Sequence, residues 1–356
     1  MISFLEKRNS QKIPARLVLS SGEVYEGFSF AWQKDSYFGE VVFTTGMVGY
    51  VESLTDPSYK GQLLTFTFPL IGNYGVPKKE FWESEKIQAS GVVIDCLSPI
   101  YEHYAAEQSF RAWLEAQKVP LIFGVDTRAL TKTLRKGASM GAIVQGKTLP
   151  TAFIDPNQSH LVAEVSTRQI KEYGKGKKKI IAVDCGIKEN ILRSLLQFPV
   201  TIKRVPFDYD YSQEEYDGLF ISNGPGDPAM CKETIAILKK ALFSKKPIFG
   251  ICLGTQLIAL STGAKTYKLP FGHRGQNQPC QSTDGKCYLT SQNHGYAIVE
   301  ESLPRDWSVS FRNLNDLSIE GIQHKTRPIF AVQFHPEAAP GPLDTSFLFQ
   351  QFYEML

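Results

Sequence analysis

Residues 250–256 read Gly-Ile-Cys-Leu-Gly-Thr-Gln, with a glycine two positions before and two positions after Cys252. An apolar run, 247–249, precedes this stretch, and a helix-like run, 256–260, follows it. The layout predicts a nucleophile elbow, in which a strand ends, turns sharply and starts a helix with the nucleophile at the apex. The glycines allow a strained backbone and a close approach of strand to helix. At the helix N-terminus, unpaired N–H groups and the helix dipole favour a thiolate over a thiol.

A base and its partner are predicted in Phe334-His335-Pro336-Glu337. In an extended chain residues i and i+2 face the same way, so Glu337 can act beside His335 while Pro336 stiffens the link. A lone cysteine in an apolar run is more often a small core residue, and a lone His-Pro-Glu is more often a surface turn. Their combination favours Cys252 as a nucleophile, His335 as its base and Glu337 as the orienter of the base.

The composition limits the kind of protein. A length of 356 residues suggests two domains, each with enough material for its own core. The formal net charge of +3 gives no case for nucleic acid or an anionic membrane as a partner. The six cysteines lack metal-type spacing and suit a reducing compartment. Neither a signal peptide nor an apolar run long enough for a membrane span is found, so a cytoplasmic protein is expected.

The first part of the chain reads as strand-rich, with short apolar runs bounded by glycine or proline. A hairpin is expected within 16–30, and helices are expected at 103–117 and 127–136, the last with Asp126 as its N-cap. The pattern then lapses, and a lysine-rich stretch is typical of a solvated linker. The expected organisation is an N-terminal domain over 1–153, a linker over 154–178 and a C-terminal domain over 179–356.

From Lys179 onward, buried-type strands alternate with helix-length segments. Such alternation implies a parallel, doubly wound sheet, with a site formed by the loops at the carboxyl ends of its strands. After residue 264 the pattern is strand-rich again, up to a helix over 344–355. The predicted fold class is α/β, with a doubly wound, mostly parallel sheet in the C-terminal domain and a strand-rich α+β N-terminal domain.

The loop Ser222-Asn223-Gly224-Pro225-Gly226-Asp227-Pro228 follows one of these strands, which places it on the same rim as Cys252. Glycines alternating with proline make a rigid loop whose backbone N–H groups can point at an anion. The absence of a Walker lysine weakens a phosphate-binding interpretation. An oxyanion hole fits better, with the N–H groups of Gly226 and Leu253 as its donors. Taken alone, the loop is equally well a plain turn.

A second polar cluster, Gln292-Asn293-His294-Gly295-Tyr296, stands between apolar runs. His294 competes with His335 for the role of base, but it has no carboxylate within two residues. We therefore interpret His294 as a structural or substrate-binding residue. No metal site is predicted, because His273, Cys280 and Cys287 lack the spacing of metal ligands.

These motifs carry a family resemblance. The stretches 250–256, 222–228 and 334–337 resemble the three signatures of the class I glutamine amidotransferases. Further strings resemble the small subunit of carbamoyl-phosphate synthetase, and they extend the resemblance over nearly the whole chain. In the N-terminal half they are GEVVF (39–43), MVGY (47–50), LTDPSY (54–59), PLIGNYG (69–75) and DTRALT (126–131). In the C-terminal half they are GAKTYK (263–268), RGQNQP (274–279), SQNHGYA (291–297) and FHPEAAPGP (334–342).

The resemblance implies a glutaminase that supplies ammonia to a separate subunit. In family terms, Cys252 attacks the side-chain amide of glutamine, and His335, oriented by Glu337, moves the proton. A γ-glutamyl thioester forms, ammonia leaves, and water releases glutamate. The family's glutamine contacts correspond here to Gly224, Gly226, Leu253, Gln256, Asn293, Gly295 and Tyr296.

Two positions depart from the common family pattern. Gly46 stands where bacterial members have a serine that contacts glutamine, and Thr255 stands where the commonest elbow has histidine. Multidomain eukaryotic relatives also carry glycine at the first position, so an altered backbone contact of Gly46 is expected rather than lost activity.

The resemblance places the remaining chemistry on a partner. The chain shows no nucleotide-binding fold, so no cofactor is expected in it, and ATP and Mg²⁺ are expected on the large synthetase subunit. The expected complex is a heterodimer that makes carbamoyl phosphate from bicarbonate for arginine or pyrimidine synthesis. One alternative is another enzyme on the same fold, such as the amidotransferase of a different synthase or a γ-glutamyl hydrolase. Another is a non-catalytic subunit that senses glutamine, although the presence of Cys252, His335 and Glu337 argues against it.

Overall fold

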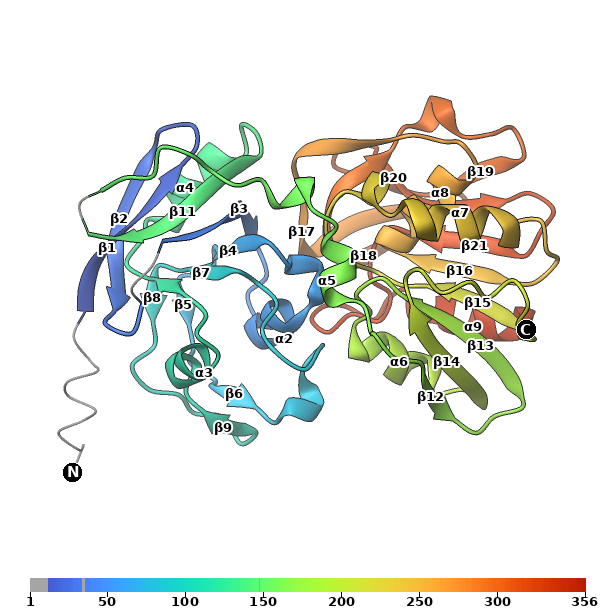
Figure 1. Cartoon of the computed structure of the whole chain (residues 1–356), viewed down its shortest axis with the longest axis horizontal. Coiled ribbons are helices and arrows are strands. Elements are labelled where there is room, and N and C mark those ends of the chain that lie inside the picture. The colour runs from blue at the N-terminus through green and yellow to red at the C-terminus, as the bar shows by residue number, and fades with distance from the viewer. Residues whose placement is uncertain (1–11, 34–35, 147) are drawn as a thin grey trace. The chain divides into compact units, whose positions relative to one another are not determined.

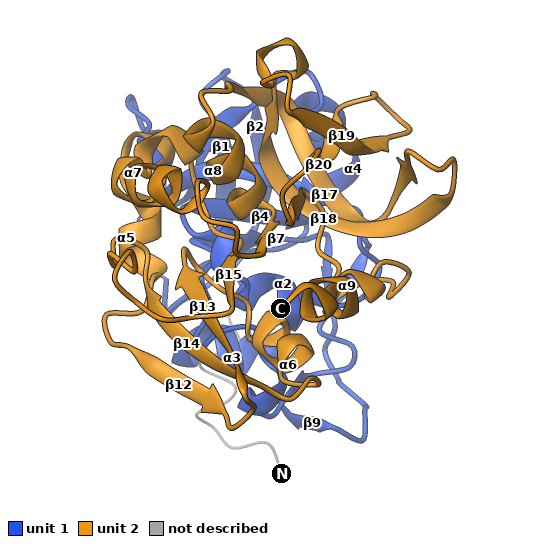
Figure 2. Cartoon of the chain, turned by 90° about the vertical axis from the view of Figure 1, so that its right-hand side faces the viewer, with its two compact units in different colours: residues 1–156 blue, residues 157–356 orange. Residues whose placement is uncertain are grey.

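The computed structural model describes residues 12–33, 36–146 and 148–356 (Figure 1). The chain divides into two compact units, an N-terminal unit over residues 1–156 and a C-terminal unit over residues 157–356 (Figure 2). No helix in these described ranges is long and apolar enough to cross a membrane.

A mixed sheet forms the centre of the N-terminal unit, with seven strands among its described residues. Strands β3, β4, β7 and β10 run parallel to one another, and β11, β1 and β2 add an antiparallel half. The pairing of β1 with β2 confirms the expected hairpin. In their order across the sheet, the strands are β10 (Leu121–Ile122), β7 (Gly91–Val93), β4 (Gln62–Phe66), β3 (Tyr37–Thr44), β11 (Ser139–Gln145), β1 (Lys12–Leu19) and β2 (Val24–Phe30).

Both faces of this sheet are covered. Neighbouring residues of β4, Leu63 and Leu64, belong to two different apolar clusters, because successive side chains of a strand point to opposite faces. One cluster includes side chains of α2 and α3, and the other includes side chains of α4. The helices are α2 (Tyr50–Thr55), α3 (Phe110–Ala116) and α4 (Thr127–Leu134). Two small sheets pair β5 (Leu70–Ile71) with β8 (Cys96–Leu97), and β6 (Val76–Pro77) with β9 (Ala106–Gln108).

Side-chain caps set the starts of two of these helices. The carboxylate of Asp126 accepts a hydrogen bond from the N–H of Ala129 at 2.8 Å, which confirms the predicted N-cap of α4. The helix expected over 103–117 begins later than predicted. The hydroxyl of Ser109 caps α3 by accepting from the N–H of Ala112 at 3.1 Å, and the residues just before it pair in β9.

A sheet with ten strands among the described residues forms the centre of the C-terminal unit. Its five central strands β14, β13, β15, β16 and β21 run parallel, as the predicted doubly wound core requires. The other strands pair antiparallel, and most of them come from the strand-rich stretch after residue 264. In their order across the sheet, the strands are β12 (Lys171–Gly174), β14 (Val200–Pro206), β13 (Lys178–Asp184), β15 (Gly218–Ile221), β16 (Ile248–Ile251), β21 (Ile329–Val332), β20 (Ile319–His324), β19 (Trp307–Asn313), β17 (Thr266–Ser282) and β18 (Cys287–Ile298).

Helices cover both faces of the parallel half of this sheet (Figure 1). Ile181 packs in a cluster with side chains of α7 and α8, whereas its neighbour Ile180 packs in a cluster with side chains of α6 and α9. The α-helices of this unit are α5 (Leu161–Val165), α6 (Glu189–Leu195), α7 (Lys232–Ala241), α8 (Leu253–Ser261) and α9 (Phe347–Met355). Short 3-10 helices along the chain are η1 (Pro57–Tyr59), η2 (Lys79–Phe81), η3 (Pro156–Gln158), η4 (Pro228–Met230) and η5 (Glu300–Ser302).

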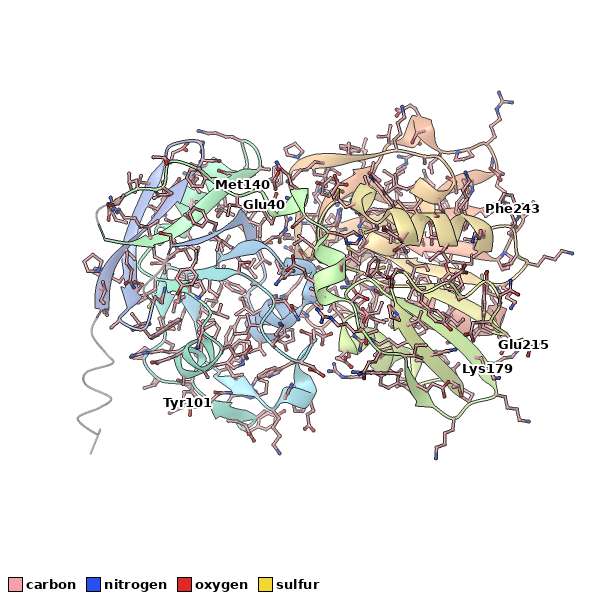
Figure 3. The ribbon with its side chains drawn as sticks, in the orientation of Figure 1. Glu40, Tyr101, Met140, Lys179, Glu215 and Phe243 are labelled. Atoms are coloured by element: carbon pink, nitrogen blue, oxygen red, sulfur yellow. The ribbon has the colours of Figure 1, made fainter. Side chains whose placement is uncertain are left out.

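The segment expected to be a linker, 154–178, contains regular structure. It includes α5 and the edge strand β12, which pairs with β14, and residues from 157 onward belong to the C-terminal unit. Its lysines fit this place as well as they fit a linker, because charged side chains on an edge strand discourage pairing with another chain. Lys171 on the edge strand β12 is exposed. Lys179, just after this segment on the interior strand β13, also points outward in Figure 3.

Candidate active site

The carboxyl ends of four neighbouring parallel strands form one rim of the C-terminal sheet. In spatial order these strands are β13, β15, β16 and β21. The segments that follow them are 185–188, 222–228, Cys252 with the start of α8, and 333–337. Residues far apart in the sequence therefore meet at one edge, which is where ligands bind in open α/β sheets.

Cys252 occupies a strained turn between β16 and α8. Its backbone has φ 54° and ψ −107°, in the region that side chains rarely adopt, and its N–H donates to the carbonyl of Val332 at 2.8 Å. A β-carbon at Gly254 would overlap the carbonyl oxygen of Ile221, and one at Gly250 would lie 2.6 Å from Ile258 Cδ1. The glycines thus allow the close contact of strand and helix that a nucleophile elbow requires.

His335 and Glu337 lie side by side after β21. The Nδ1 atom of His335 is 2.7 Å from the Oε1 atom of Glu337, and both side chains are buried. The ammonium of Lys188 lies 2.9 Å from the same carboxylate oxygen and also donates to the carbonyl of Ala338 at 2.6 Å. The sequence analysis missed Lys188. Its signal is a lysine in the short segment 185–188 that follows a buried strand, at the N-cap position of α6.

The charges of this group support one another. Burial raises the pKa of Glu337, but the charges of Lys188 and then His335 outweigh burial and hold it well below its ordinary value. Burial lowers the pKa of His335, but Glu337 and then Cys252 outweigh burial and raise it well above its ordinary value. Glu337 therefore stays ionised, and the imidazolium form of His335 is favoured.

The sulfur of Cys252 contacts strand β18. Its Sγ atom donates to the backbone carbonyl of Asn293 at 3.6 Å. The Nε2 atom of His335 is buried and makes no hydrogen bond of normal length with the described residues, and Cys252 is one of the groups that raise the pKa of this ring. The N–H of His335 donates to the carbonyl of Ser291 at 2.8 Å, which ties the segment of the base to β18.

The glycine-rich loop is fixed to both of its neighbours on the rim. Ser222 Oγ accepts from the N–H of Cys185 at 2.9 Å, and Asn223 Oδ1 accepts from the N–H of Lys188 at 3.2 Å. A β-carbon at Gly224 would lie 2.1 Å from the carbonyl oxygen of Cys185 and 2.8 Å from Leu253 Cδ2, so only glycine fits at this position. Gly226 has φ +85°, which favours glycine. The oxyanion roles of Gly226 and Leu253 stay predictions.

The predicted glutamine contacts of the C-terminal unit gather around Cys252. The side-chain amide of Gln256 donates to the carbonyl of Tyr296 and to Gln333 Oε1, both at 3.0 Å. This joins helix α8 to the stretch of β18 that also holds Asn293 and Gly295. Roles of these residues in binding glutamine stay predictions.

The two positions that depart from the family pattern lie in different units. The hydroxyl of Thr255 donates to the carbonyl of Val332 at 2.6 Å and so anchors α8 to β21. Gly46 follows β3 in the N-terminal unit, where its N–H donates to Thr44 Oγ1 at 3.3 Å. Its contact with glutamine stays a prediction.

The arrangement of the site suits one kind of chemistry. A cysteine at a strained turn, with an imidazole, a carboxylate and an ammonium nearby, suits acyl transfer through a thioester.

Comparisons with known proteins agree with this geometry. A family model described as Glutamine amidotransferase class-I matches residues 181–355, and one described as Carbamoyl-phosphate synthase small chain, CPSase domain, matches residues 17–144. The carbamoyl phosphate synthase arginine-specific small chain of Aspergillus niger is 47% identical, over 96% of this chain and 79% of its own length.

Two longer animal proteins are also similar to this chain. The mitochondrial carbamoyl-phosphate synthase (ammonia) of Aquarana catesbeiana is 48% identical and that of Homo sapiens is 44% identical, each over 96% of this chain. The chain spans only 24% of the length of each of these two proteins.

Proposed function

Because the chain belongs to the carbamoyl-phosphate synthase small chain family, we propose that it hydrolyses L-glutamine and delivers the ammonia to a synthetase large subunit. One observation carries this proposal. Cys252 lies at a strained turn, and the same strand ends hold a buried chain of contacts from Lys188 through Glu337 to His335.

The chemistry proceeds in two balanced steps. The thiolate of Cys252 attacks the side-chain carbonyl carbon of glutamine, and N–H groups of Gly226 and Leu253 stabilise the oxyanion. The C–N bond breaks, His335 gives its proton to the leaving nitrogen, and ammonia departs from a γ-glutamyl thioester. Water then attacks the thioester and gives a proton to His335, the C–S bond breaks, and glutamate is released. The sum is glutamine plus water to glutamate plus ammonia.

The residues beside the reacting atoms have distinct tasks. Glu337 holds the imidazole of His335 in place and stabilises its charged form, and Lys188 keeps Glu337 ionised. ATP, Mg²⁺ and bicarbonate are proposed to bind the large subunit, which forms carbamoyl phosphate there.

We propose a cytoplasmic location, because the six free cysteines suit a reducing compartment. The animal relatives are named as mitochondrial, so a mitochondrial location is the alternative. Cell fractionation with detection of the native protein separates the two.

The nucleophile is tested in the complex with the large subunit. Cys252→Ala is expected to abolish carbamoyl phosphate synthesis from glutamine while leaving synthesis from added ammonia intact, because only the thioester step needs the sulfur. Cys287→Ser, which changes an exposed free cysteine, is the matched control and should keep both activities. Normal glutamine turnover by Cys252→Ala would remove the nucleophile assignment and with it the proposed function.

The partner is tested by the rate of the isolated chain. We propose that the N-terminal unit provides part of the docking surface for the large subunit, so that ammonia passes to it instead of escaping to water. An active site that depends on a partner should turn over slowly without it, because hydrolysis uncoupled from synthesis wastes glutamine. Glutamate release should be slow for the isolated chain and should rise substantially with large subunit, ATP and bicarbonate. Full-speed hydrolysis that no synthetase affects would instead favour a stand-alone hydrolase.

A further inference from the structure

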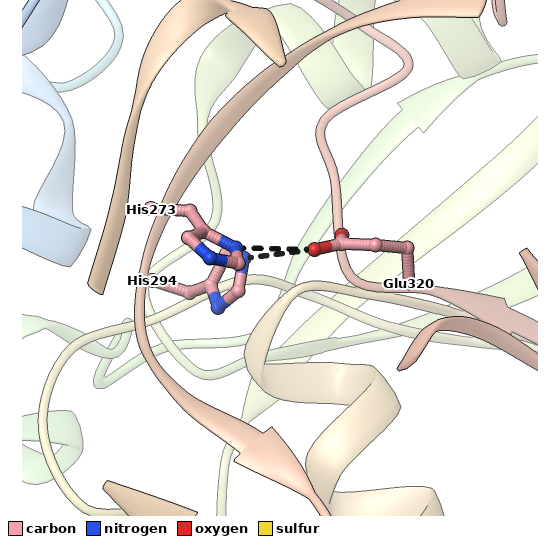
Figure 4. A group of neighbouring side chains, drawn as sticks. All are labelled: His273, His294 and Glu320. Carbon is pink, nitrogen blue, oxygen red and sulfur yellow. Dashed lines mark hydrogen bonds and ion pairs between the residues drawn. The ribbon is translucent and has the colours of Figure 1, made fainter. Parts of the chain in front are cut away.

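Two histidines and a glutamate form a buried cluster in the antiparallel half of the C-terminal sheet. His273 comes from β17, His294 from β18 and Glu320 from β20 (Figure 4). Oε1 of Glu320 lies 3.2 Å from His273 Nδ1 and 3.6 Å from His294 Nε2. The two imidazole rings stand nearly perpendicular, with centroids 4.9 Å apart. One carboxylate oxygen thus faces both rings.

The neighbours of this cluster favour hydrogen bonds over a metal ion. The side-chain amide nitrogen of Asn313 lies 3.4 Å from both His273 Nδ1 and Glu320 Oε1. The oxygen of the same amide accepts from the N–H of Asn315 at 2.9 Å, which fixes the orientation of the group. An N–H donor therefore points at the place that a cation would occupy, and such a donor opposes a positive charge there.

The histidines differ in their surroundings. Both nitrogens of His273 face carboxylates, with Asp316 Oδ2 2.9 Å from Nε2, so this ring is favoured as an imidazolium. His294 also has acceptors on both sides, the carbonyl of Tyr296 at 2.9 Å from Nδ1 and Gln292 Oε1 at 3.2 Å from Nε2. Burial lowers the pKa of His294, and the charge of Glu320 is the first influence that opposes burial.

The cluster connects directly to the stretch around the reactive sulfur. The carbonyl of Tyr296 accepts from His294 Nδ1 and also from the side-chain amide of Gln256 on the helix that follows Cys252. The residue before His294, Asn293, offers its carbonyl to the sulfur of Cys252. The N–H of Gln333, just before the base, donates to the carbonyl of Glu320 at 2.9 Å.

We propose that Glu320 and His273 are positioning residues: they hold the ring of His294, and through it the main chain of 293–296, in the conformation that binds glutamine. This inference rests on the proposed function, since it concerns how glutamine is bound at that same site. Glu320 adds a second acceptor at Nε2 of His294, beside Gln292 Oε1. Because Nδ1 of the same ring donates to the carbonyl of Tyr296, the loss of Glu320 should loosen the ring and that carbonyl together.

The test compares two substitutions of one residue in the full chain with its large subunit. Glu320→Ala should raise KM for glutamine roughly ten- to a hundred-fold, because buried polar partners are left unpaired. The value of kcat should change by less than about threefold, since no reacting atom is touched. Glu320→Gln should restore most of the affinity, because its side-chain oxygen can still accept from the two imidazole rings. Asp306→Ala, which breaks the His324–Asp306 pair of the same unit, is the control and should leave KM unchanged.

A second readout does not depend on turnover. Hydrogen exchange of the backbone amides in the peptide 293–297 should speed up in Glu320→Ala and return to the wild-type rate in Glu320→Gln. If the wild-type complex did not hydrolyse glutamine, the proposed function would fall, and hydrogen exchange would still decide whether Glu320 holds this strand. A folded Glu320→Ala protein with unchanged KM and unchanged exchange would overturn the inference. Stoichiometric metal in the wild type that is lost in Glu320→Ala would overturn it as well.

Discussion

A single buried carboxylate, that of Glu337, faces two cationic side chains at once, Lys188 and His335. Its ionisation depends on both, and the charge of the imidazole depends on it in return. Removing one member of such a group leaves the others buried without compensation, which is far more costly than losing an exposed ion pair. The chemistry of the candidate site and the stability of its surroundings are therefore linked through one residue.

The pH dependence of unfolding reports this link. The pKa of Glu337 lies below its ordinary value of 4.5, so its stabilisation is present above pH 4.5 and is lost as the pH falls through the lowered pKa. The pKa of His335 lies above its ordinary value of 6.5, so its stabilisation is present below pH 6.5 and is lost as the pH rises through the raised pKa. The stabilisation from the pair is therefore complete between pH 4.5 and pH 6.5.

Glu337→Gln should lower Tm by about 10 °C in that window, because breaking a buried pair costs about 3–5 kcal/mol. The difference from the wild type should shrink at lower and at higher pH. Thermal unfolding followed by circular dichroism from about pH 3 to about pH 10 measures it. A Tm difference that does not vary with pH would refute the charge assignment.

Short sequence motifs were enough to select Cys252, His335 and Glu337 as candidates, because each belongs to a local pattern with a chemical reason. Lys188 and Glu320 escaped sequence analysis for the opposite reason. Each acts on a partner that only the folding of the sheet brings near, and the place of Lys188 after a buried strand does not by itself point to a carboxylate partner. Such contacts between distant segments can be predicted only when the register of the sheet is known, and local sequence patterns do not give the register.

At the scale of elements, helix α8 depends on how closely it approaches the sheet. Its residues from Leu253 to Ala259 are all buried, and its first turn lies against the carbonyl of Ile221 at the end of β15. The absence of a β-carbon at Gly254 permits this approach. The position of the sulfur at the start of α8 therefore depends on a glycine that has no part in the chemistry.

Gly254→Ala should displace α8 and lower kcat for glutamine hydrolysis by at least about tenfold, since misplacing a reacting group by even about 1 Å costs up to about a hundredfold. It should also destabilise the protein by about 1–3 kcal/mol, as overpacking does. Gly137→Ala is the matched control, because a β-carbon there meets nothing within 4 Å. Activity assays and thermal unfolding of both variants decide, and wild-type activity in Gly254→Ala would show that the helix does not need this contact.

Elements with a strong periodic pattern were predicted from the sequence, the helix α4 close to its observed bounds, and elements that depend on distant pairing were not. The helix α4 and the strands of the parallel core follow from apolar spacing and a capping aspartate. The strands β9 and β12 did not, because both are short and polar and exist only through pairing with β6 and β14. Their residues favour a helix or a linker when read locally.

At the scale of the C-terminal unit, the two halves of the sheet contribute differently to the site. The parallel half places Cys252 and His335, the proposed nucleophile and base, after the ends of its strands. The antiparallel half supplies the strand β18, whose carbonyl groups contact the sulfur and the amide of Gln256. Strand β21 lies where the halves meet, with β16 on one side and β20 on the other.

A proline in β21 should therefore harm the whole unit. Ala331 pairs with Gly250 on one side and Ile322 on the other, so Ala331→Pro should cost about 3 kcal/mol or more through lost ladder bonds. Glu172→Pro in the edge strand β12, which pairs on one side only, should cost less. The yield of soluble protein and the melting curve test this order, and equal tolerance at both positions would contradict it.

The central place of β21 also has a consequence for synthesis on the ribosome. Of the three neighbours, β16 emerges first, β20 follows, and β21 emerges last, although it must lie between the other two. Until then, β16 and β20 each present an unpaired edge, which is a site for pairing with other nascent chains. His335 and Glu337 lie in the segment 333–337 that follows β21. The residues proposed as base and orienter therefore emerge only after the strand that closes the sheet, so a nascent chain that ends before β21 lacks both of them.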